Sequence, residues 1–414
     1  MKNFLTVLAA LAILGVGAVA AYVIEKRYEA RDIVGSSTEE FVASEPEERP
    51  PARPDEEVWP FFGYDSERRK APALFRQRPP YRAVWVFRGR ALLEFPPVIA
   101  YKRAYVANNS GRLFAINVRT GKAKWSFLGR RCTASSPAVA NGIVYQAFMI
   151  RLPCSARGGQ GADGELVALN ARTGKVRWRR RIGPSETSPV VAGGLVYVGD
   201  SRGYVYAFRA RTGRTRWAFR AADAVKGGVA VSGHRLYVGA YGGRLYALDA
   251  RSGRLLWRSS SQNRLGGRGN FYATPVAAYG RVYIGNTDGK MYSYGATSGH
   301  IRWSHQTGSY VYSSPAVWKQ RVYAGSHDKN LYCFDAATGR VRWRFRANGK
   351  ISGSPTVIDG LVYFSTVKGR TYALDARNAR LRWRWPDGQY TAVVADRRRL
   401  YVVGYSKLYA LVRK

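Results

Sequence analysis

The segment "LYALDARSGRLLW" (residues 245–257) decides the fold, because the chain repeats it at nearly regular intervals. "VYAFRARTGRTRW" (205–217) precedes it and "LYCFDAATGRVRW" (331–343) follows it. Each copy joins an alternating apolar stretch to a Thr-Gly or Ser-Gly pair and then to a tryptophan. The alternation predicts a β-strand, and the glycine permits the positive φ that a hairpin turn needs. Each copy therefore predicts the last two strands of a repeat unit.

Tryptophans mark the period of these units. They lie 39 to 53 residues apart, and a unit of about 40 residues holds four short strands, which is the size of a propeller blade. Because a blade cannot bury its own faces, we interpret the tryptophans as apolar plates that dock each blade on the next. These blade-docking residues are Trp85, Trp125, Trp178, Trp217, Trp257, Trp303, Trp343 and Trp383.

The two ends of the repeat array complement each other. "YRAVWVFRG" (81–89) reads as an outermost strand without the other three, and residues 390–414 read as three strands without an outermost one. Together they complete one blade and leave no exposed sheet edge in the ring. The prediction is an all-β, eight-bladed β-propeller over residues 81–414. Its blades are four-stranded and antiparallel, and strand 81–89 pairs with the C-terminal strands.

Three segments precede the predicted propeller. Residues 1–24 contain an uncharged, mainly apolar run about long enough to cross a bilayer. We expect a transmembrane signal anchor there, although "AVA" (18–20) also fits a cleavage site. Residues 25–57 are acidic and rich in proline, which predicts a disordered tether. Residues 58–80 are aromatic enough to dock on the propeller as a lead-in segment.

The cysteines bear on the compartment. Cys132 lies between the outer strand of one blade and the inner strand of the next, and Cys154 lies in a long insert of that next blade. Both connections leave a four-stranded meander on the same face, so we expect a Cys132–Cys154 disulfide and an oxidising compartment. The basic residues Lys26, Arg27 and Arg31 alone would place the propeller in the cytoplasm. We give the disulfide more weight and expect a single-pass cell-membrane protein with an extracytoplasmic propeller.

The chain carries a formal net charge of +40. Such a surface favours anionic partners, among them an acidic envelope polymer, although an arginine-rich composition produces the same charge without any partner. No recognised nucleic-acid motif is present, and the expected compartment also argues against nucleic acid.

The connections that enter the innermost strands vary most between units. They encircle the axis on one side of the ring, the funnel face, whereas the other side, the turn face, carries the uniform Thr-Gly turns. Variable loops on a uniform scaffold are where a ligand site is expected. Their aromatic residues can also plug the channel while their charges pair with one another. The candidate ligand contacts are Glu94, Arg131, Glu186, Asp223, Lys226, Arg264, Arg268, Tyr272, Tyr310, Tyr312, Lys350 and Tyr390.

These units resemble the pyrroloquinoline-quinone-type propeller repeat, whose "LYALDAxTGxxxW" phrase is matched by residues 245–257. That family includes quinone-dependent alcohol and glucose dehydrogenases. It also includes a non-catalytic propeller lipoprotein of the outer-membrane barrel assembly machinery. For a dehydrogenase, the resemblance implies adjacent cysteines at the cofactor and a calcium ion held by carboxylate and amide groups. Here no two cysteines are adjacent, and neither a dense acidic cluster nor a histidine pair with metal-ligand spacing is present.

We therefore expect a monomeric, membrane-anchored module without cofactor or metal that binds or scaffolds a protein or an anionic envelope polymer. A dehydrogenase that uses pyrroloquinoline quinone (PQQ) and calcium, or a related redox enzyme, is the alternative.

Overall fold

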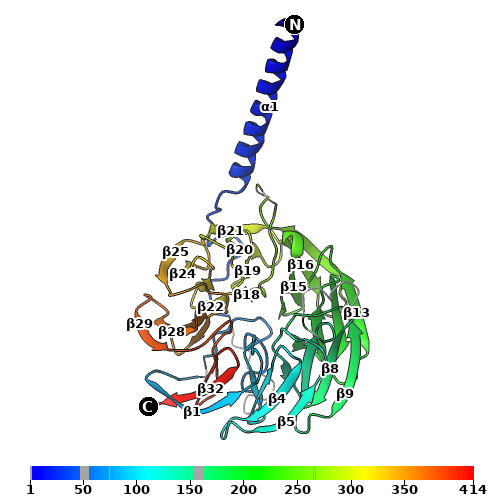
Figure 1. The fold of residues 1–414 in the computed structure, drawn as a ribbon, viewed down its shortest axis with the longest axis vertical. Helices are drawn as coiled ribbons and strands as arrows, with labels where there is room; N and C mark the ends of the chain where they lie inside the picture. The colour runs from blue at the N-terminus through cyan, green and yellow to red at the C-terminus, as the bar shows by residue number, and fades with distance from the viewer. Residues whose placement is uncertain are drawn as a thin grey trace.

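The computed structural model describes residues 2–46, 56–73, 75–152, 154, 163–263, 265 and 267–414. Within them the chain forms a ring of eight four-stranded antiparallel sheets, and helix α1 (Lys2–Glu29) projects from the side of the ring (Figure 1). Seven sheets contain four consecutive strands, β2–β5 through β26–β29, which we number as blades 1 to 7. The predicted eight-bladed propeller is confirmed.

The consecutive blades have the following strand bounds. Blades 1 to 4 comprise β2 (Val98–Ala100), β3 (Arg103–Ala107), β4 (Arg112–Asn117), β5 (Ala123–Leu128); β6 (Ala138–Ala140), β7 (Ile143–Phe148), β8 (Gly164–Asn170), β9 (Val176–Ile182); β10 (Val190–Ala192), β11 (Leu195–Gly199), β12 (Tyr204–Arg209), β13 (Thr215–Arg220); β14 (Val229–Ser232), β15 (Arg235–Ala240), β16 (Arg244–Asp249), β17 (Leu255–Ser260). Blades 5 to 7 comprise β18 (Val276–Ala278), β19 (Arg281–Gly285), β20 (Lys290–Gly295), β21 (Ile301–Gln306); β22 (Ala316–Trp318), β23 (Arg321–Gly325), β24 (Asn330–Asp335), β25 (Val341–Arg346); β26 (Thr356–Ile358), β27 (Leu361–Thr366), β28 (Arg370–Asp375), β29 (Leu381–Trp385). The 3-10 turn η2 (Tyr241–Gly243) joins β15 to β16.

Blade 8 closes the ring with strands from both ends of the repeat array. Its order is β1-β32-β31-β30, with β1 (Tyr81–Arg88), β30 (Val394–Ala395), β31 (Leu400–Val403) and β32 (Lys407–Arg413). β1 pairs antiparallel with β32 from Tyr81 opposite Arg413 to Arg88 opposite Lys407. The predicted closure by residues 81–89 is therefore confirmed.

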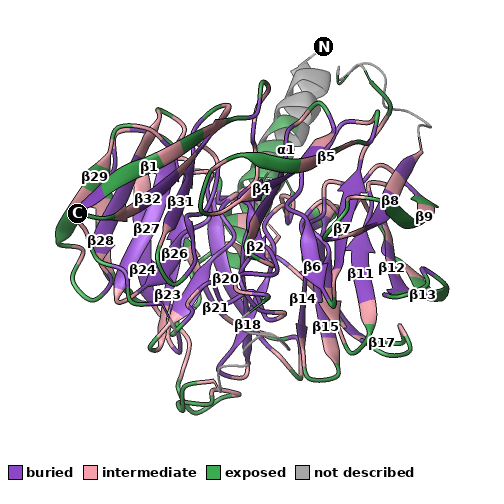
Figure 2. Ribbon diagram, turned by 90° about the horizontal axis from the view of Figure 1, so that it is seen from below, coloured by how far each residue is buried: buried purple, intermediate pink, exposed green. Residues whose placement is uncertain are grey.

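Burial follows the distance of each strand from the axis. The inner and second strands are mostly buried, whereas outer strands such as β1 and β5 alternate between exposed and partly buried residues (Figure 2). The core therefore lies between neighbouring blades, where each sheet packs on the next.

The blade junctions repeat one polar contact that the sequence did not reveal. Trp217 Nε1 and Tyr197 Oη of blade 3 both donate to the Ala250 carbonyl of blade 4, each at 3.0 Å. Gly253 of the blade 4 turn has a φ of 78°, and a Cβ there would lie 2.7 Å from the Trp217 ring. The docking tryptophans thus act as hydrogen-bond donors as well as apolar plates. The equivalent indole bonds join Trp85 to Val118, Trp125 to Ala171, Trp178 to Ala210, Trp257 to Ala296, Trp303 to Ala336 and Trp343 to Ala376.

Trp383 of blade 7 makes a different junction with the closing blade. Its ring meets the Tyr81 ring edge-on, with centroids 5.2 Å apart. Tyr81 Oη in turn lies 2.9 Å from Tyr363 Oη. The closing junction therefore depends on aromatic contacts with the strand that completes the ring.

The lead-in segment (residues 58–80) crosses the axis and serves as the hub of the ring. Trp59 pairs with Ile99 of the inner strand of blade 1 in an antiparallel bridge. Further lead-in carbonyls accept backbone hydrogen bonds from other inner strands, which would otherwise present unpaired edges to the axis. These bonds run from Val139 to Pro60, Val231 to Ser66, Ala277 to Glu67, Val317 to Arg69 and Val357 to Lys70, at 2.7 to 3.1 Å.

Arg68 and Lys70 of the lead-in segment are fully buried. The Arg68 guanidinium donates to the carbonyls of Val229 at 2.8 Å, Ser188 at 2.9 Å, Pro189 at 3.3 Å and Phe62. Burial lowers the pKa of Arg68 to about 9, although the Asp65 carboxylate opposes that shift. Burial and the neighbouring Arg68 also lower the pKa of Lys70.

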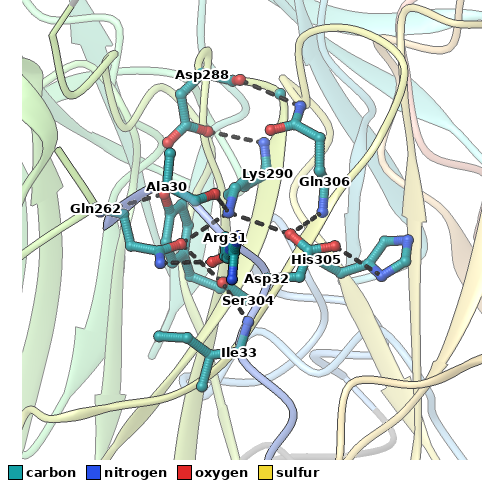
Figure 3. Close-up of polar contacts among 12 residues, drawn as sticks. Ala30, Arg31, Asp32, Ile33, Gln262, Asp288, Lys290, Ser304, His305 and Gln306 are labelled. Atoms are coloured by element: carbon teal, nitrogen blue, oxygen red, sulfur yellow. Dashed lines mark hydrogen bonds and ion pairs between the residues drawn. The ribbon is translucent and has the colours of Figure 1, made fainter. Parts of the chain in front are cut away.

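Residues 30–46, which we call the strap, dock on the propeller and do not form the expected disordered tether. Residues 30–33 lie along the outer strand of blade 5 (Figure 3). Gly35 donates to the Thr338 carbonyl of blade 6 at 3.0 Å, and Val42 donates to the Tyr279 carbonyl of blade 5 at 3.0 Å. Ile33 and Ser304 of β21 exchange two backbone hydrogen bonds of 3.2 and 2.9 Å, so the strap extends the edge of the sheet. Asp32 accepts from Lys290 Nζ at 3.1 Å and from the Gln306 amide at 2.9 Å. The acidic side chains of the strap, from which we predicted disorder, pair with basic side chains of the propeller. Residues 47–55 of the expected tether lie outside the described residues.

The expected transmembrane anchor at residues 1–24 is not supported. Among the residues that the structure describes, no helix is both long enough and apolar enough to span a membrane.

Candidate functional site

A cavity of about 290 Å³ opens on the funnel face at the axis, and we call it the pit. Its walls come from the connections that enter the innermost strands, as the sequence predicted for a ligand site. Phe62 of the lead-in segment also lines it, and the hub fills the axis beyond, so the pit is blind. Six predicted contacts line the pit: Glu94, Glu186, Lys226, Tyr272, Tyr312 and Tyr390.

The other predicted contacts lie elsewhere. Asp223 pairs with Arg244 at 2.8 Å, and the Arg131 guanidinium binds the Asp163 carbonyl. Tyr310 is half exposed beside Tyr312, with ring centroids 5.8 Å apart. Arg268 and Lys350 do not line the pit, and Arg264 falls outside the described residues. The sequence could not distinguish residues that line the pit from residues at its rim, because the loops that carry them differ in length.

The two carboxylates of the pit have different partners. Glu186 Oε1 lies 2.8 Å from Lys226 Nζ, and Glu186 Oε2 accepts the Tyr272 hydroxyl at 3.0 Å. Burial opposes the charge on Lys226, yet Glu186 outweighs it and raises the pKa of Lys226. Glu94 forms no hydrogen bond or ion pair with any residue that the structure describes. Burial and the nearby Glu186 charge raise the pKa of Glu94.

Aromatic rings form one wall of the pit. The Tyr272 and Tyr312 rings stand almost perpendicular, at 84° with centroids 5.4 Å apart, and His327 stands 4.8 Å from Tyr312. His327 Nε2 lies 2.7 Å from Ser352 Oγ. Burial and the Lys350 charge lower the pKa of His327, which disfavours the charged form of its ring.

Hydroxyl groups link neighbouring blades around the pit. Ser314 Oγ accepts from the Thr274 amide at 2.9 Å, and Ser354 Oγ accepts from the Ser314 amide at 3.1 Å. Ser188 Oγ likewise accepts from the Ser136 amide at 3.0 Å. Sequence reasoning missed these lining residues, although their signal was the hydroxyl before proline that recurs with the blade period.

A disulfide joins Cys132 to Cys154 on the same face, the pair that the sequence suggested. Cys132 also exchanges backbone hydrogen bonds of 2.9 and 2.8 Å with Ile150 and Met149. The disulfide therefore joins the connection that enters blade 2 to the long insert of that blade.

The pit does not fit PQQ with calcium. PQQ is itself a polycarboxylate, and the lining offers it one ammonium, already paired with Glu186, together with the unpaired carboxylate of Glu94. A calcium site needs several oxygen ligands, usually including carboxylates. In the described part of the chain, no three His, Cys, Asp or Glu side chains are grouped so that they could hold a metal ion.

A family model described as "Outer membrane protein assembly factor BamB" matches residues 77–201, 151–220 and 201–414. The chain belongs to this BamB family. Over 125 residues it is 26% identical to the outer membrane protein assembly factor BamB of Salmonella typhimurium, and the Escherichia coli protein of that name gives the same identity. These matches span 28% of this chain and 28% of each relative.

Solved structures share the fold of this BamB-family chain. BamB from Moraxella catarrhalis superimposes with a TM-score of 0.66 at 17% identity, covering 80% of this chain and 100% of that one. The quinohemoprotein alcohol dehydrogenase from Comamonas testosteroni gives a TM-score of 0.71 at 15% identity, covering 86% and 80%. At such identities the likeness establishes the fold alone.

Proposed function

We propose that this BamB-family propeller is a membrane-associated, extracytoplasmic scaffold that binds a protein partner through its funnel face. The observation that carries the proposal is the blind pit, where charged and aromatic side chains gather at the connections that depart from the repeat. Concave sites with aromatic walls and a few fixed polar groups are typical of binding sites. The curated relatives are named as outer membrane protein assembly factors, which supports a protein partner.

Two observations support the compartment. The Cys132–Cys154 disulfide fits an oxidising environment outside the cytoplasm. The described part of α1 exposes large apolar side chains, which favour contact with a membrane. These are Leu14, Val16, Val19 and Ile24.

An anionic envelope polymer is the second candidate partner, and the net charge of +40 favours it. The unpaired carboxylate of Glu94 argues against an anionic group inside the pit, so such a polymer would bind elsewhere on the basic surface. Dehydrogenase activity has only the shared fold in its favour, because the pit residues do not suit the quinone.

The test is site-specific photocrosslinking in the native cell envelope. A benzophenone amino acid replaces Tyr310 at the rim of the pit in one protein and Lys122 on the turn face in a matched control. We expect a discrete adduct with one protein from position 310 and none from position 122. The purified partner should then bind the purified chain. Absence of an adduct at 310, equal adducts from both faces, or failure of the purified pair to bind would refute the proposal.

A further inference from the structure

One carboxylate in the pit has no counter-charge among the described side chains and is available to bind a cation. Four ionisable side chains with an acidic or basic group line it: Glu94, Glu186, Lys226 and His327. Lys226 neutralises Glu186 at 2.8 Å, and burial and the Lys350 charge lower the pKa of His327, which disfavours its charged form. Glu94 has no partner in the described part of the chain. The lining therefore carries a surplus carboxylate inside a protein of net charge +40.

The aromatic wall offers a second attraction for a cation. The perpendicular rings of Tyr272 and Tyr312 form a corner, and Tyr390 and Phe95 line the same pit. The faces of aromatic rings attract ammonium groups, more strongly where water is excluded. An anion would instead meet the Glu94 carboxylate.

The hydroxyls of the pit favour a primary ammonium over a quaternary one. A primary ammonium has three N–H donors, each of which needs an acceptor when it leaves water. Ser188, Ser352 and Ser354 line the pit and place hydroxyl oxygens there in addition to Glu94. Ser188 Oγ and Ser354 Oγ each accept one backbone amide, so one lone pair of each hydroxyl remains for an N–H of a primary ammonium, whereas a quaternary ammonium has no N–H to donate.

The surroundings of the pit constrain how the ammonium is presented. The net charge of +40 repels a free small cation. An ammonium carried by an acidic segment overcomes this repulsion, because its flanking carboxylates meet the basic surface. A cavity of about 290 Å³ is also large enough for one extended side chain. Resting on the proposed function, we infer that the pit receives a lysine side chain from an acidic segment of the partner protein, with Glu94 as its counter-charge.

Calorimetric titration of the full chain tests this inference. The probe is an acidic peptide with one central lysine, Ac-Glu-Asp-Gly-Lys-Gly-Asp-Glu-NH2, and the control peptide has norleucine in place of lysine. We expect the lysine peptide to bind at least tenfold more tightly than the norleucine peptide. Glu94→Gln should abolish that preference. Glu165→Gln, the same substitution at a residue of β8 that lies outside the pit and pairs with Arg179, should preserve it.

The pH dependence of binding supplies an independent readout. The ammonium requires ionised Glu94, whose pKa is raised by burial and by Glu186. The other titratable groups that line the pit are Glu186, Lys226, Tyr272, Tyr312, His327 and Tyr390, and the charge of Lys350 acts on His327 from outside the lining. The preference for the lysine peptide over the norleucine peptide should therefore increase as the pH rises through the pKa of Glu94, and this increase should disappear in Glu94→Gln.

Several results would overturn the inference. They are equal binding of both peptides, no binding of either, or an unchanged lysine preference in Glu94→Gln. If Glu94→Gln does not fold, Tyr312→Leu replaces it and should reduce the lysine preference at least threefold; an unchanged preference overturns the inference. The crosslink from position 310 separates the two proposals. If it persists while the peptides fail, the scaffold stands and the lysine site falls.

Discussion

The lead-in segment and the strap both precede the repeats, yet the ring holds them in opposite ways. The lead-in segment lies on the axis, where the buried cation of Arg68 is satisfied by backbone carbonyls of different blades. The strap docks on blades 5 and 6, and its acidic side chains pair with basic ones of blade 5. The lead-in segment therefore contacts many blades, whereas the strap contacts few. We therefore expect the lead-in segment to be part of the folding unit and the strap to detach without unfolding the ring.

The largest effect is expected for Arg68→Met. Methionine has a similar length but leaves the carbonyls of Val229, Ser188 and Pro189 buried without a donor. Unsatisfied buried polar groups cost about 1–3 kcal/mol each, so we expect a loss of about 3–5 kcal/mol in the free energy of unfolding. Chemical denaturation of the full chain measures it. Arg76→Met, at an exposed lead-in position, should change stability by less than about 0.5 kcal/mol. Equal effects at both positions would contradict the hub assignment.

A smaller effect, confined to the strap, is expected for Gly35→Ala. A Cβ at Gly35 would lie 2.6 Å from the Ala337 carbonyl oxygen and 2.7 Å from that of Arg302. Such overpacking typically costs about 1–3 kcal/mol of stability. The strap can avoid that cost by leaving the ring, so hydrogen exchange at residues 30–46 should accelerate while the thermal midpoint of the ring stays the same.

Ser37→Ala, at an exposed position in the same segment, is the matched control for Gly35→Ala. A fall in the ring midpoint with Gly35→Ala would show that the strap belongs to the folding unit after all.

A still smaller effect is expected for Glu40→Gln. The Glu40 carboxylate accepts from Ser298 Oγ at 2.5 Å and from Arg302 Nη2 at 2.6 Å. Removing its charge should weaken strap docking by about 1–2 kcal/mol. Glu39 also contacts Arg302 but its side chain is 63% exposed, so Glu39→Gln should cost less than about 0.5 kcal/mol. Exchange rates at residues 30–46 measure both, and a larger effect from Glu39 would contradict the assignment.

The same carboxylate makes strap docking sensitive to acid. Burial raises the pKa of Glu40, but hydrogen bonds from Ser298 and Arg302 outweigh burial and lower that pKa overall. Docking is therefore complete above the pKa of the free carboxylate and is lost as pH falls through the docked value. Exchange at residues 30–46 should increase below about pH 4.5, and Glu40→Gln should remove most of this dependence.

Sequence alone predicted the ring because its determinants are local and repeated. Six of the eight blade junctions pair a tryptophan with a turn glycine, as Trp217 and Gly253 do, and such a period is visible in the sequence. The docking of the strap was not predicted, because disorder was inferred from the low content of apolar residues in this segment. Its docking instead depends on charge pairing with a particular blade, as between Asp32 and Lys290.

The pit was predicted in part for a related reason. Glu94, Glu186 and Tyr272 stood out because they depart from the repeat. His327 and Ser354 did not, because they occupy positions that the repeat fills anyway. The burial of Arg68 in the lead-in segment could not be predicted either. An arginine in a sequence is expected at the surface, and most of the backbone carbonyls that bind it come from distant parts of the chain.

The strap also determines how mechanical tension would travel through the molecule. A pull on α1 reaches residues 30–46 before it reaches the hub, and the Ile33–Ser304 bridge is among the first contacts to bear the load. The hub, in contrast, is held by hydrogen bonds from several blades at once. Tension on α1 would therefore load the strap first, and the ring would bear it only after the strap contacts had separated.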